Sequence, residues 1–493
     1  MEQLRTRCVA GQMKSIDVLP DDVLLAIFDF CVDQDVAQGP FLRLLFAEPT
    51  KKKIEAWQLL VHVCRRWRCI VFGSPLRLNL QLLCTAKTPA RDTLDVWPAL
   101  PLFIRSRGND QTESVDNIIA VLEHSDRVCQ IDLKAVRSRH LEKVSAAMQE
   151  PFPELTHLKL HSSRHDETVP ALPGSFLGGS APRLQELKLD RVPFPGLPKL
   201  LLSTTYLVTL HLKIIPHSGY ISPEAMVTCL SVLGSLEDLC LFFESPQSRP
   251  DPASRRPPPP TRSALPVLTY FWFKGASDYL EDLVAGIDAP RLNRLYIILF
   301  NQIVFDTPQF VQFISRTPAL NEPETARVAF EGSSARVNLT SGYGKLDVEI
   351  SCRELDWLVS SLEQVCTSSL PPLFILENLY IYAAPYWGRH RGKNIDIENT
   401  LWLELLHPFT TVKNLYLCED FAPHVVPALH ELVGGRTTEV LPTLQSIFLE
   451  NLQPSGPIQV PLQEAIEQFV AARQVTSHPI TFARWDDPKQ DKV

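Results

Sequence analysis

Leucines and other aliphatic residues recur along residues 128 to 449 in a six-position pattern, L-x-x-L-x-L. Typical copies are Leu155-x-x-Leu158-x-Leu160 and Leu184-x-x-Leu187-x-Leu189. The distance from one copy to the next suits one strand followed by one returning helix. A repeat of this kind predicts stacked strand–helix units, each of which buries its apolar side against the next.

The predicted fold is therefore α/β: an irregular leucine-rich-repeat solenoid with a parallel sheet on its concave face, preceded by an N-terminal α-helical unit. One step between copies, from Leu295 to Leu379, is much longer than the others. Within this step the segments 327–331, 335–340 and 346–351 alternate like short strands and are linked by glycine-rich turns. We expect extra strands there.

The residue between the two leucines of L-x-L points away from the core, because side chains alternate along a strand. These positions are basic or titratable in the first copies and aromatic in the later ones. Aromatic rows on a surface are typical of interfaces, although strand propensity alone also favours aromatic residues. We expect the concave face to bind a protein substrate through aromatic positions with a basic flank: Lys159, Lys188, His211, Trp272, Tyr296, Tyr380, Tyr416 and Phe448. A second interpretation, of equal weight, is that the insert 300–375 or the C-terminal tail folds over this row.

Two helices are predicted before the repeats. The first begins near Pro20, which is tolerated at a helix start, and has Asp21 and Asp22 in its first turn, where the helix dipole favours acids. The second is predicted over 56–67, with basic residues near its C-terminal end. Both carry apolar stripes at helical spacing.

The two predicted helices together resemble an F-box. That family has Leu-Pro at the start of its first helix and Leu-x-x-Val-Cys-(Lys/Arg)-x-Trp in its second, which match Leu19-Pro20 and residues 60–67 here. The chain departs from the family in residues 33–55, which make the spacing between the halves longer than usual. The resemblance extends to F-box proteins with leucine-rich-repeat-like regions in mushroom-forming fungi. The linker-binding residues that it implies are Leu19, Pro20, Val23, Leu24, Ile27, Phe28, Leu60, Val61, Cys64 and Trp67.

The resemblance implies a substrate receptor of an SCF-type ubiquitin ligase, in which the F-box docks on a Skp-type linker and through it on a cullin–RING ligase. Such an adaptor is not an enzyme, since other subunits transfer ubiquitin. The alternative is a leucine-rich-repeat scaffold or receptor without a ligase role, with residues 15–83 as an N-terminal cap.

The predicted organisation is a loose leader (1–14), the F-box helical unit (15–83), a connecting region (84–126), the solenoid (127–482) and a loose tail (483–493). Residues 246–262 are rich in proline and arginine. We interpret them as a disordered surface insert, although a proline-rich recognition motif also fits this composition.

Composition and motifs also bear on which classes of partner and site to expect. The net charge of −8 does not favour a nucleic-acid partner, and no apolar run is long enough to span a membrane. Eleven cysteines without framework spacing indicate reduced thiols in the cytoplasm or nucleus. The sequence has no phosphate-binding, zinc-protease or nucleophile-elbow motif, and His161, His165 and Asp166 fit a solvated loop better than a metal site. We therefore expect no catalytic residue, metal or cofactor.

Overall fold

The computed structural model describes residues 19–37, 56–75, 78, 80–86, 89–106, 115–164, 168–246, 261–300, 305, 307–331, 334–351, 355–370, 373, 375–383, 398–433, 436, 438–450, 459–476 and 478–485. The predicted leader 1–14, most of the proline-rich insert 246–262 and the last part of the predicted tail lie outside the described residues. The chain divides into two compact units. The first comprises 1–105 and 112–130, and the second comprises 106–111 and 131–493.

The first unit contains the predicted helices, with one difference. The first predicted helix is α1 (Asp21–Ala37), but the second is broken into α3 (Ala56–Val61) and α4 (Arg65–Gly73). The break falls at Cys64, whose backbone is extended and whose Sγ accepts a hydrogen bond from the Trp67 amide at 3.5 Å. The Cys64 side chain thus caps the N-terminus of α4, after α3 has ended at Val61.

The predicted connecting region folds as part of the first unit. It contains α5 (Ala90–Val96), β2 (Leu102–Ser106) and α6 (Asp116–Leu122), and β1 (Leu82–Cys84) lies at its start, mostly within the predicted F-box unit. β1 and β2 pair in parallel, with Leu82 opposite Leu102. The segment 84–126 is thus strand and helix rather than a simple connector.

The second unit is a large, mainly parallel sheet with helices between its strands. Its order from β4 onward is β4-β5-β6-β7-β9-β11-β14-β13-β12-β15-β16-β17-β18. β3 (Val128–Val136) spans the boundary between the units in the sequence. The strands are β4 (His157–Ser162), β5 (Glu186–Asp190), β6 (Thr209–Ile215), β7 (Asp238–Phe243), β9 (Tyr270–Gly275), β11 (Arg294–Phe300), β12 (Thr325–Glu331), β13 (Ser334–Thr340), β14 (Lys345–Ser351), β15 (Asn378–Ala383), β16 (Asn414–Leu417), β17 (Ser446–Glu450) and β18 (Thr481–Trp485).

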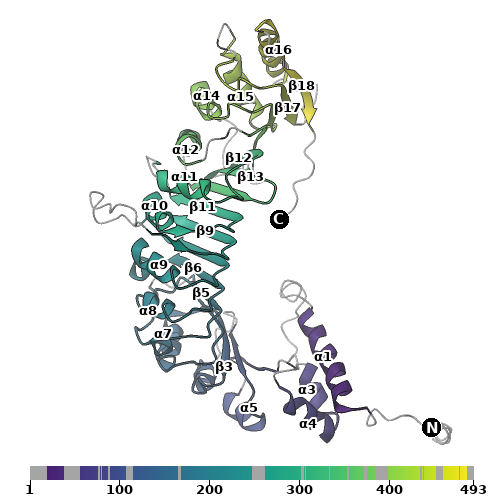
Figure 1. Ribbon diagram of the computed structural model, residues 1–493, viewed down its shortest axis with the longest axis vertical. Coiled ribbons are helices and arrows are strands. Elements are labelled where there is room, and N and C mark those ends of the chain that lie inside the picture. The colour runs from purple at the N-terminus through teal and green to yellow at the C-terminus, as the bar shows by residue number, and fades with distance from the viewer. Residues whose placement is uncertain are drawn as a thin grey trace, which may run out of the picture. The chain divides into compact units, whose positions relative to one another are not determined.

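The helices of this unit alternate with its strands, and Figure 1 shows α7 to α10 along one side of the strands from β4 to β11. A short parallel pair, β8 (Ser263–Ala264) with β10 (Ile287–Asp288), lies outside the main sheet. The helices are α7 (Ser138–Ala147), η2 (Phe176–Gly179), α8 (Leu197–Leu201), η3 (His217–Gly219), α9 (Pro223–Leu230), α10 (Ser277–Ala285), α11 (Pro308–Ser315), α12 (Leu355–Ser368), α14 (Asn399–Leu406), α15 (Ala422–His430) and α16 (Gln459–Val475).

The predicted extra strands in the long step are β12, β13 and β14. They pair with one another antiparallel, and their outer members pair in parallel with β15 and β11. The three described strands of the insert therefore lie within the sheet and not over it. Elsewhere in the described part of the unit the strand pairs are parallel, as the repeat pattern predicts.

Buried leucines of the repeat pattern form the core of the second unit. In the described repeats, the two leucine-type positions of L-x-L are at most 3% exposed in each strand from β4 to β17, as with Leu210 and Leu212. The register places each pair opposite the equivalent pair of the next strand. Burial of one such side chain contributes about 1.5–3 kcal/mol, so the repeated pattern is the main source of cohesion.

Structure continues beyond the predicted end of the solenoid at residue 482. β18 pairs in parallel with β17 as far as Trp485, so residues 483–485 are not part of a loose tail. The described helices include none that is both long and apolar enough to cross a membrane.

A buried carboxylate joins two neighbouring repeats. Glu281 on α10 is 4% exposed and accepts hydrogen bonds from the backbone amides of Gln309 at 2.9 Å and Phe310 at 2.7 Å. These amides belong to the first turn of α11, which has no acid of its own. Glu281 thus caps the helix of the next repeat and complements its dipole.

We expect Glu281→Gln to lower the free energy of unfolding by about 1–3 kcal/mol, because one charge-assisted acceptor is lost in a buried site. Urea denaturation followed by circular dichroism measures the change. Glu404→Gln, at an exposed position on α14, is the matched control and should change stability by less than about 0.5 kcal/mol. Equal effects of the two variants would contradict the capping role.

Candidate functional site

The candidate site is the outer sheet face, defined as the face that carries the residues between the two core positions of each strand. The strand register places these residues side by side in one row. In sheet order the row is Lys159, Lys188, His211, Cys240, Trp272, Tyr296, Asp347, Asn338, Arg327, Tyr380, Tyr416, Phe448 and Ala483.

The predicted aromatic row is interrupted. Tyr296 and Tyr380 are not neighbours, because β14, β13 and β12 separate their strands. These three strands contribute Asp347, Asn338 and Arg327 to the row. The predicted row therefore forms two aromatic groups on either side of a polar centre, and the predicted aromatic side chains are half-buried rather than fully exposed.

The predicted basic flank is paired with acids. The Nζ atoms of Lys159 and Lys188 lie 2.7 and 2.5 Å from the two carboxylate oxygens of Glu186. His211 Nε2 lies 2.8 Å from Asp238 Oδ2. This end of the face is thus a charge-paired surface with little net positive charge. The sequence pattern did not single out Glu186 and Asp238, because each lies two residues before a position of the row.

The first aromatic group contains four rings on β7, β9 and β11. Trp272 contacts Phe242 at a centroid distance of 4.6 Å, and Tyr296 contacts Trp272 at 6.1 Å and Tyr270 at 5.5 Å. Lysines lie over this group: Lys213 Nζ is 5.5 Å from the Trp272 ring, and Lys345 Nζ is 5.2 Å from the Tyr296 ring. Cation–π contacts of this kind contribute about 0.5–1 kcal/mol at exposed sites. Burial raises the pKa of Tyr270 to about 12.

The polar centre is built around a buried carboxylate. Asp347 is 5% exposed and accepts a hydrogen bond from Asn338 Nδ2 at 3.1 Å. Arg336 Nε lies 3.6 Å from Asp347, and the same guanidinium lies 2.9 Å from Glu331 and 3.7 Å from Glu349. Burial is the largest influence on Asp347 and raises the pKa of its carboxyl, against the opposing effects of Arg336, Lys345 and Asn338. Burial likewise raises the pKa of Glu349.

The second aromatic group is a ladder of stacked rings. Tyr380 and Tyr416 stack at 4.2 Å with an interplanar angle of 8°, and Tyr416 and Phe448 stack at 4.5 Å with 9°. Trp485 of β18 packs at an angle against Tyr380 and Tyr416, with centroid distances of 5.7 and 5.4 Å. Trp485, the last residue that the structure describes, packs on this end of the row as a member of β18, and whether the later tail residues cover the row stays a prediction.

Cys240 lies between His211 and Trp272 in the row. Its side chain is fully buried, and burial raises the pKa of its thiol to about 12. A thiol in this state is a poor nucleophile, so the adjacent Cys240, His211 and Asp238 do not form an activated cysteine.

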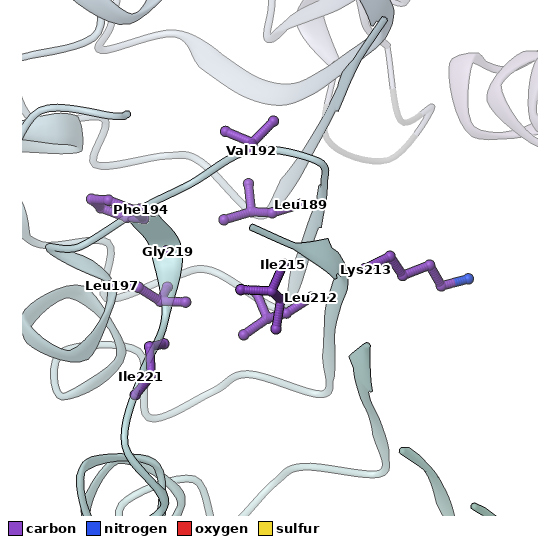
Figure 2. A pocket seen from close by; sticks show the side chains of 9 residues that line it. All are labelled: Leu189, Val192, Phe194, Leu197, Leu212, Lys213, Ile215, Gly219 and Ile221. Carbon is purple, nitrogen blue, oxygen red and sulfur yellow. The ribbon is translucent and has the colours of Figure 1, made fainter. Parts of the chain in front are cut away.

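An apolar hollow lies where β5 and β6 end, lined by residues that include Leu189, Phe194, Leu212 and Ile221. Its empty space is about 250 Å³ including the open side. Lys213 is its one charged lining residue, and Figure 2 shows the Lys213 side chain extending away from the others. No polar groups converge in it, so it lacks the features of a ligand site.

In the first unit the predicted linker-binding residues divide into two sets. Leu24, Phe28 and Val61 are at most 1% exposed, so they are the core of the unit. Leu60, Cys64 and Trp67 are half-buried, and Trp67 packs on Phe28 at 4.7 Å. Pro20, Val23 and Ile27 are exposed, and Leu19 is half-buried like Leu60, Cys64 and Trp67.

Exposed apolar residues that sequence reasoning did not single out accompany Val23 and Ile27. Phe30 is 66% exposed, Leu59 is 57% exposed and Val63 is 58% exposed. Phe30 follows Val23 and Ile27 at helical spacing on α1, so all three lie on one side of that helix. The spacing was visible in the sequence, but which stripe of α1 is buried was not.

Comparisons with models of known protein families and with curated proteins give no match. Among solved structures, the chain is similar to the leucine-rich repeat-containing protein LegL7 from Legionella pneumophila. The match has 13% sequence identity and a TM-score of 0.26, and it covers 79% of this chain and 97% of the other.

Replacing Asp347 with asparagine should alter how stability depends on pH. The pKa of Asp347 is raised on folding, so its ionised form costs stability, and this cost appears as pH rises from about 4, the ordinary value, through the folded pKa. Relative to the wild type, Asp347→Asn should therefore become more stable as pH increases over this range. Urea denaturation at several pH values measures the trend, with Glu404→Gln as a control. The opposite trend would show that the ion pair with Arg336 outweighs burial.

Alkylation should distinguish the buried Cys240 from the exposed Cys69. We expect iodoacetamide at pH 8 to label Cys69, which is exposed, and to leave Cys240 unlabelled in the folded protein. Mass spectrometry of peptides before and after unfolding in urea measures both sites. Labelling of Cys240 at the rate of Cys69 would contradict its burial.

Proposed function

We propose that the chain is a substrate-recognition adaptor of an SCF-type ubiquitin ligase, whose first unit docks on a Skp-type linker and whose outer sheet face binds a protein substrate. The observation that carries the proposal is the way the two F-box-like segments meet in the first unit. Arg66 bridges residues that are far apart in sequence, and the resulting unit leaves apolar side chains exposed.

Arg66 connects the Val-Cys-Arg-x-Trp segment to the Leu-Pro segment. Its Nη2 donates to the Leu19 carbonyl at 2.6 Å and to Asp21 Oδ1 at 2.6 Å, and its Nε donates to Asp21 Oδ1 at 3.1 Å. The Leu19 carbonyl and Asp21 lie at the start of α1, so one guanidinium fixes the position of that helix end. The ring contact between Phe28 of α1 and Trp67 of α4 also joins the two segments. The two segments of the resemblance are thus held together, although Arg66 itself occupies the unspecified position of the second motif.

A protein surface with several exposed aliphatic and aromatic side chains favours a binding role. Val23 is 39% exposed and Ile27 is 38% exposed, next to the more exposed Phe30 on the same side of α1. Clustered exposure of large apolar side chains is typical of interfaces. A terminal cap would place polar residues on this side, so the apolar side of α1 supports a docking function over a cap.

Binding to a purified Skp-type linker tests the proposal. We expect saturable binding of the full chain, and we expect Ile27→Asp to weaken it at least tenfold, because a charge replaces a desolvated apolar contact. Isothermal titration calorimetry measures the affinity. Leu19→Ala/Pro20→Ala should weaken binding in the same direction.

The matched control is Val96→Asp, which also replaces an aliphatic side chain with aspartate, at a 74% exposed position on α5 of the same unit. It should leave linker affinity unchanged, and thermal melting should show both variants folded. If the wild-type chain does not bind the linker, or if Ile27→Asp and Val96→Asp weaken binding equally, the proposed ligase role is contradicted. The chain would then be a repeat scaffold or receptor.

A further inference from the structure

The outer face of β15 to β18 differs in chemistry from the rest of the sheet. Its central row contains the ring ladder Tyr380, Tyr416 and Phe448, followed by the small residue Ala483. Every ring in the ladder is half-buried, so part of each remains accessible. Trp485 packs across Tyr380 and Tyr416 with interplanar angles of 56° and 63°. The rings therefore present an angular aromatic surface.

A row of uncharged hydrogen-bonding groups borders the ladder. Asn378, Asn414, Ser446 and Thr481 are opposite one another in the register, two residues before the aromatic positions. Asn414 Nδ2 donates to Asn378 Oδ1 at 2.9 Å, and the Ser446 and Thr481 hydroxyls are 2.9 Å apart. Neither row carries a charge, whereas the other end of the face is dense with ion pairs. The two rows thus favour a partner segment whose contacting residues are uncharged, and Glu450, opposite Trp485 in the register, places an acid at the margin of this face.

The length of the ladder, which follows from the ordinary separation of neighbouring strands, is close to one turn of a polyproline II helix. Two ring-to-ring steps of 4.2 and 4.5 Å separate Tyr380 from Phe448. A polyproline II helix advances about 3.1 Å per residue and repeats after three residues, so its turn is about 9 Å. A segment in this conformation that crosses the strands would place an equivalent residue at both ends of the ladder. Its carbonyls have no internal hydrogen bonds and need external donors; the side-chain amides and hydroxyls of the bordering row, which also bond to one another, lie beside the ladder.

We propose that the outer face of β15 to β18 binds a proline-rich segment of a partner protein in the polyproline II conformation. Proline-rich segments bind aromatic surfaces because they are already extended and lose little entropy. Arg327 lies at the Tyr380 end, with its guanidinium 5.4 Å from that ring, and is exposed. An acidic residue beside the proline run is therefore favoured at this end. The inference deepens the proposed function by naming a substrate class, and it rests on that function only in calling the partner a substrate.

Fluorescence anisotropy of a labelled decaproline peptide with the full chain, in the absence of any linker protein, tests the proposal. We expect saturable binding of decaproline and none of a glycine–serine peptide of equal length. Tyr416→Ala should weaken binding at least tenfold, because it removes the middle ring of the ladder. Tyr343→Ala should have no effect, because Tyr343 is 96% exposed on the turn between β13 and β14. Absence of decaproline binding, or equal loss in both variants, would overturn the proposal.

Further variants separate binding from folding and from the ligase role. Tyr416→Phe retains the ring and should retain most of the affinity, and thermal melting checks that Tyr416→Ala remains folded. Arg327→Glu should reverse the preference between decaproline flanked by glutamate and decaproline flanked by lysine. Ile27→Asp should bind the peptide as the wild type does, so that a failure of linker docking is distinguishable from a failure here. Saturable binding of a neutral oligosaccharide in place of decaproline would assign the surface to a sugar and overturn the proposal.

Discussion

Stacking of buried aliphatic side chains from strand to strand is the interaction on which the second unit depends. Each L-x-L pair, such as Leu187 and Leu189, lies against the equivalent pair of the next strand. Because side chains alternate along a strand, a shift of one residue would expose every core leucine. The leucine pattern thus fixes the register, and the register decides which residues meet on the outer face. Any binding function of that face follows from the packing of the core behind it.

The insert of β12, β13 and β14 shows how the same constraint changes the function of the surface. These strands join the sheet in register, with Val328, Val337 and Val348 continuing the buried row. Their outward residues are polar except Ala329, and the antiparallel pairing places Arg336 among Glu331, Glu349 and Asp347. The insert therefore divides an apolar surface in two. The ladder at the C-terminal end becomes a separate aromatic surface next to a charged one.

The sequence predicts the repeated strands, the core residues, the inserted strands and the first helix of the N-terminal unit, because each depends on local periodicity. The order of the strands in the sheet is harder to predict from the sequence. Nothing in the sequence states that β14, not β12, pairs with β11, or that the three strands insert between β11 and β15 and so keep Tyr296 and Tyr380 apart. The pairing of Lys159 and Lys188 with Glu186, and of Trp485 with the ladder, likewise depends on contacts between distant residues. In the first unit, helical spacing indicated an apolar stripe but not that Val23 and Ile27 stay exposed while Leu24 and Phe28 are buried.

Hydrogen–deuterium exchange of the full chain, with and without a Skp-type linker, tests the central claim most directly. We expect slower exchange over α1 and α3 when the linker is present, with unchanged exchange in the strands β15 to β18. Unchanged exchange throughout the first unit, at linker concentrations that saturate a known F-box protein, would contradict it.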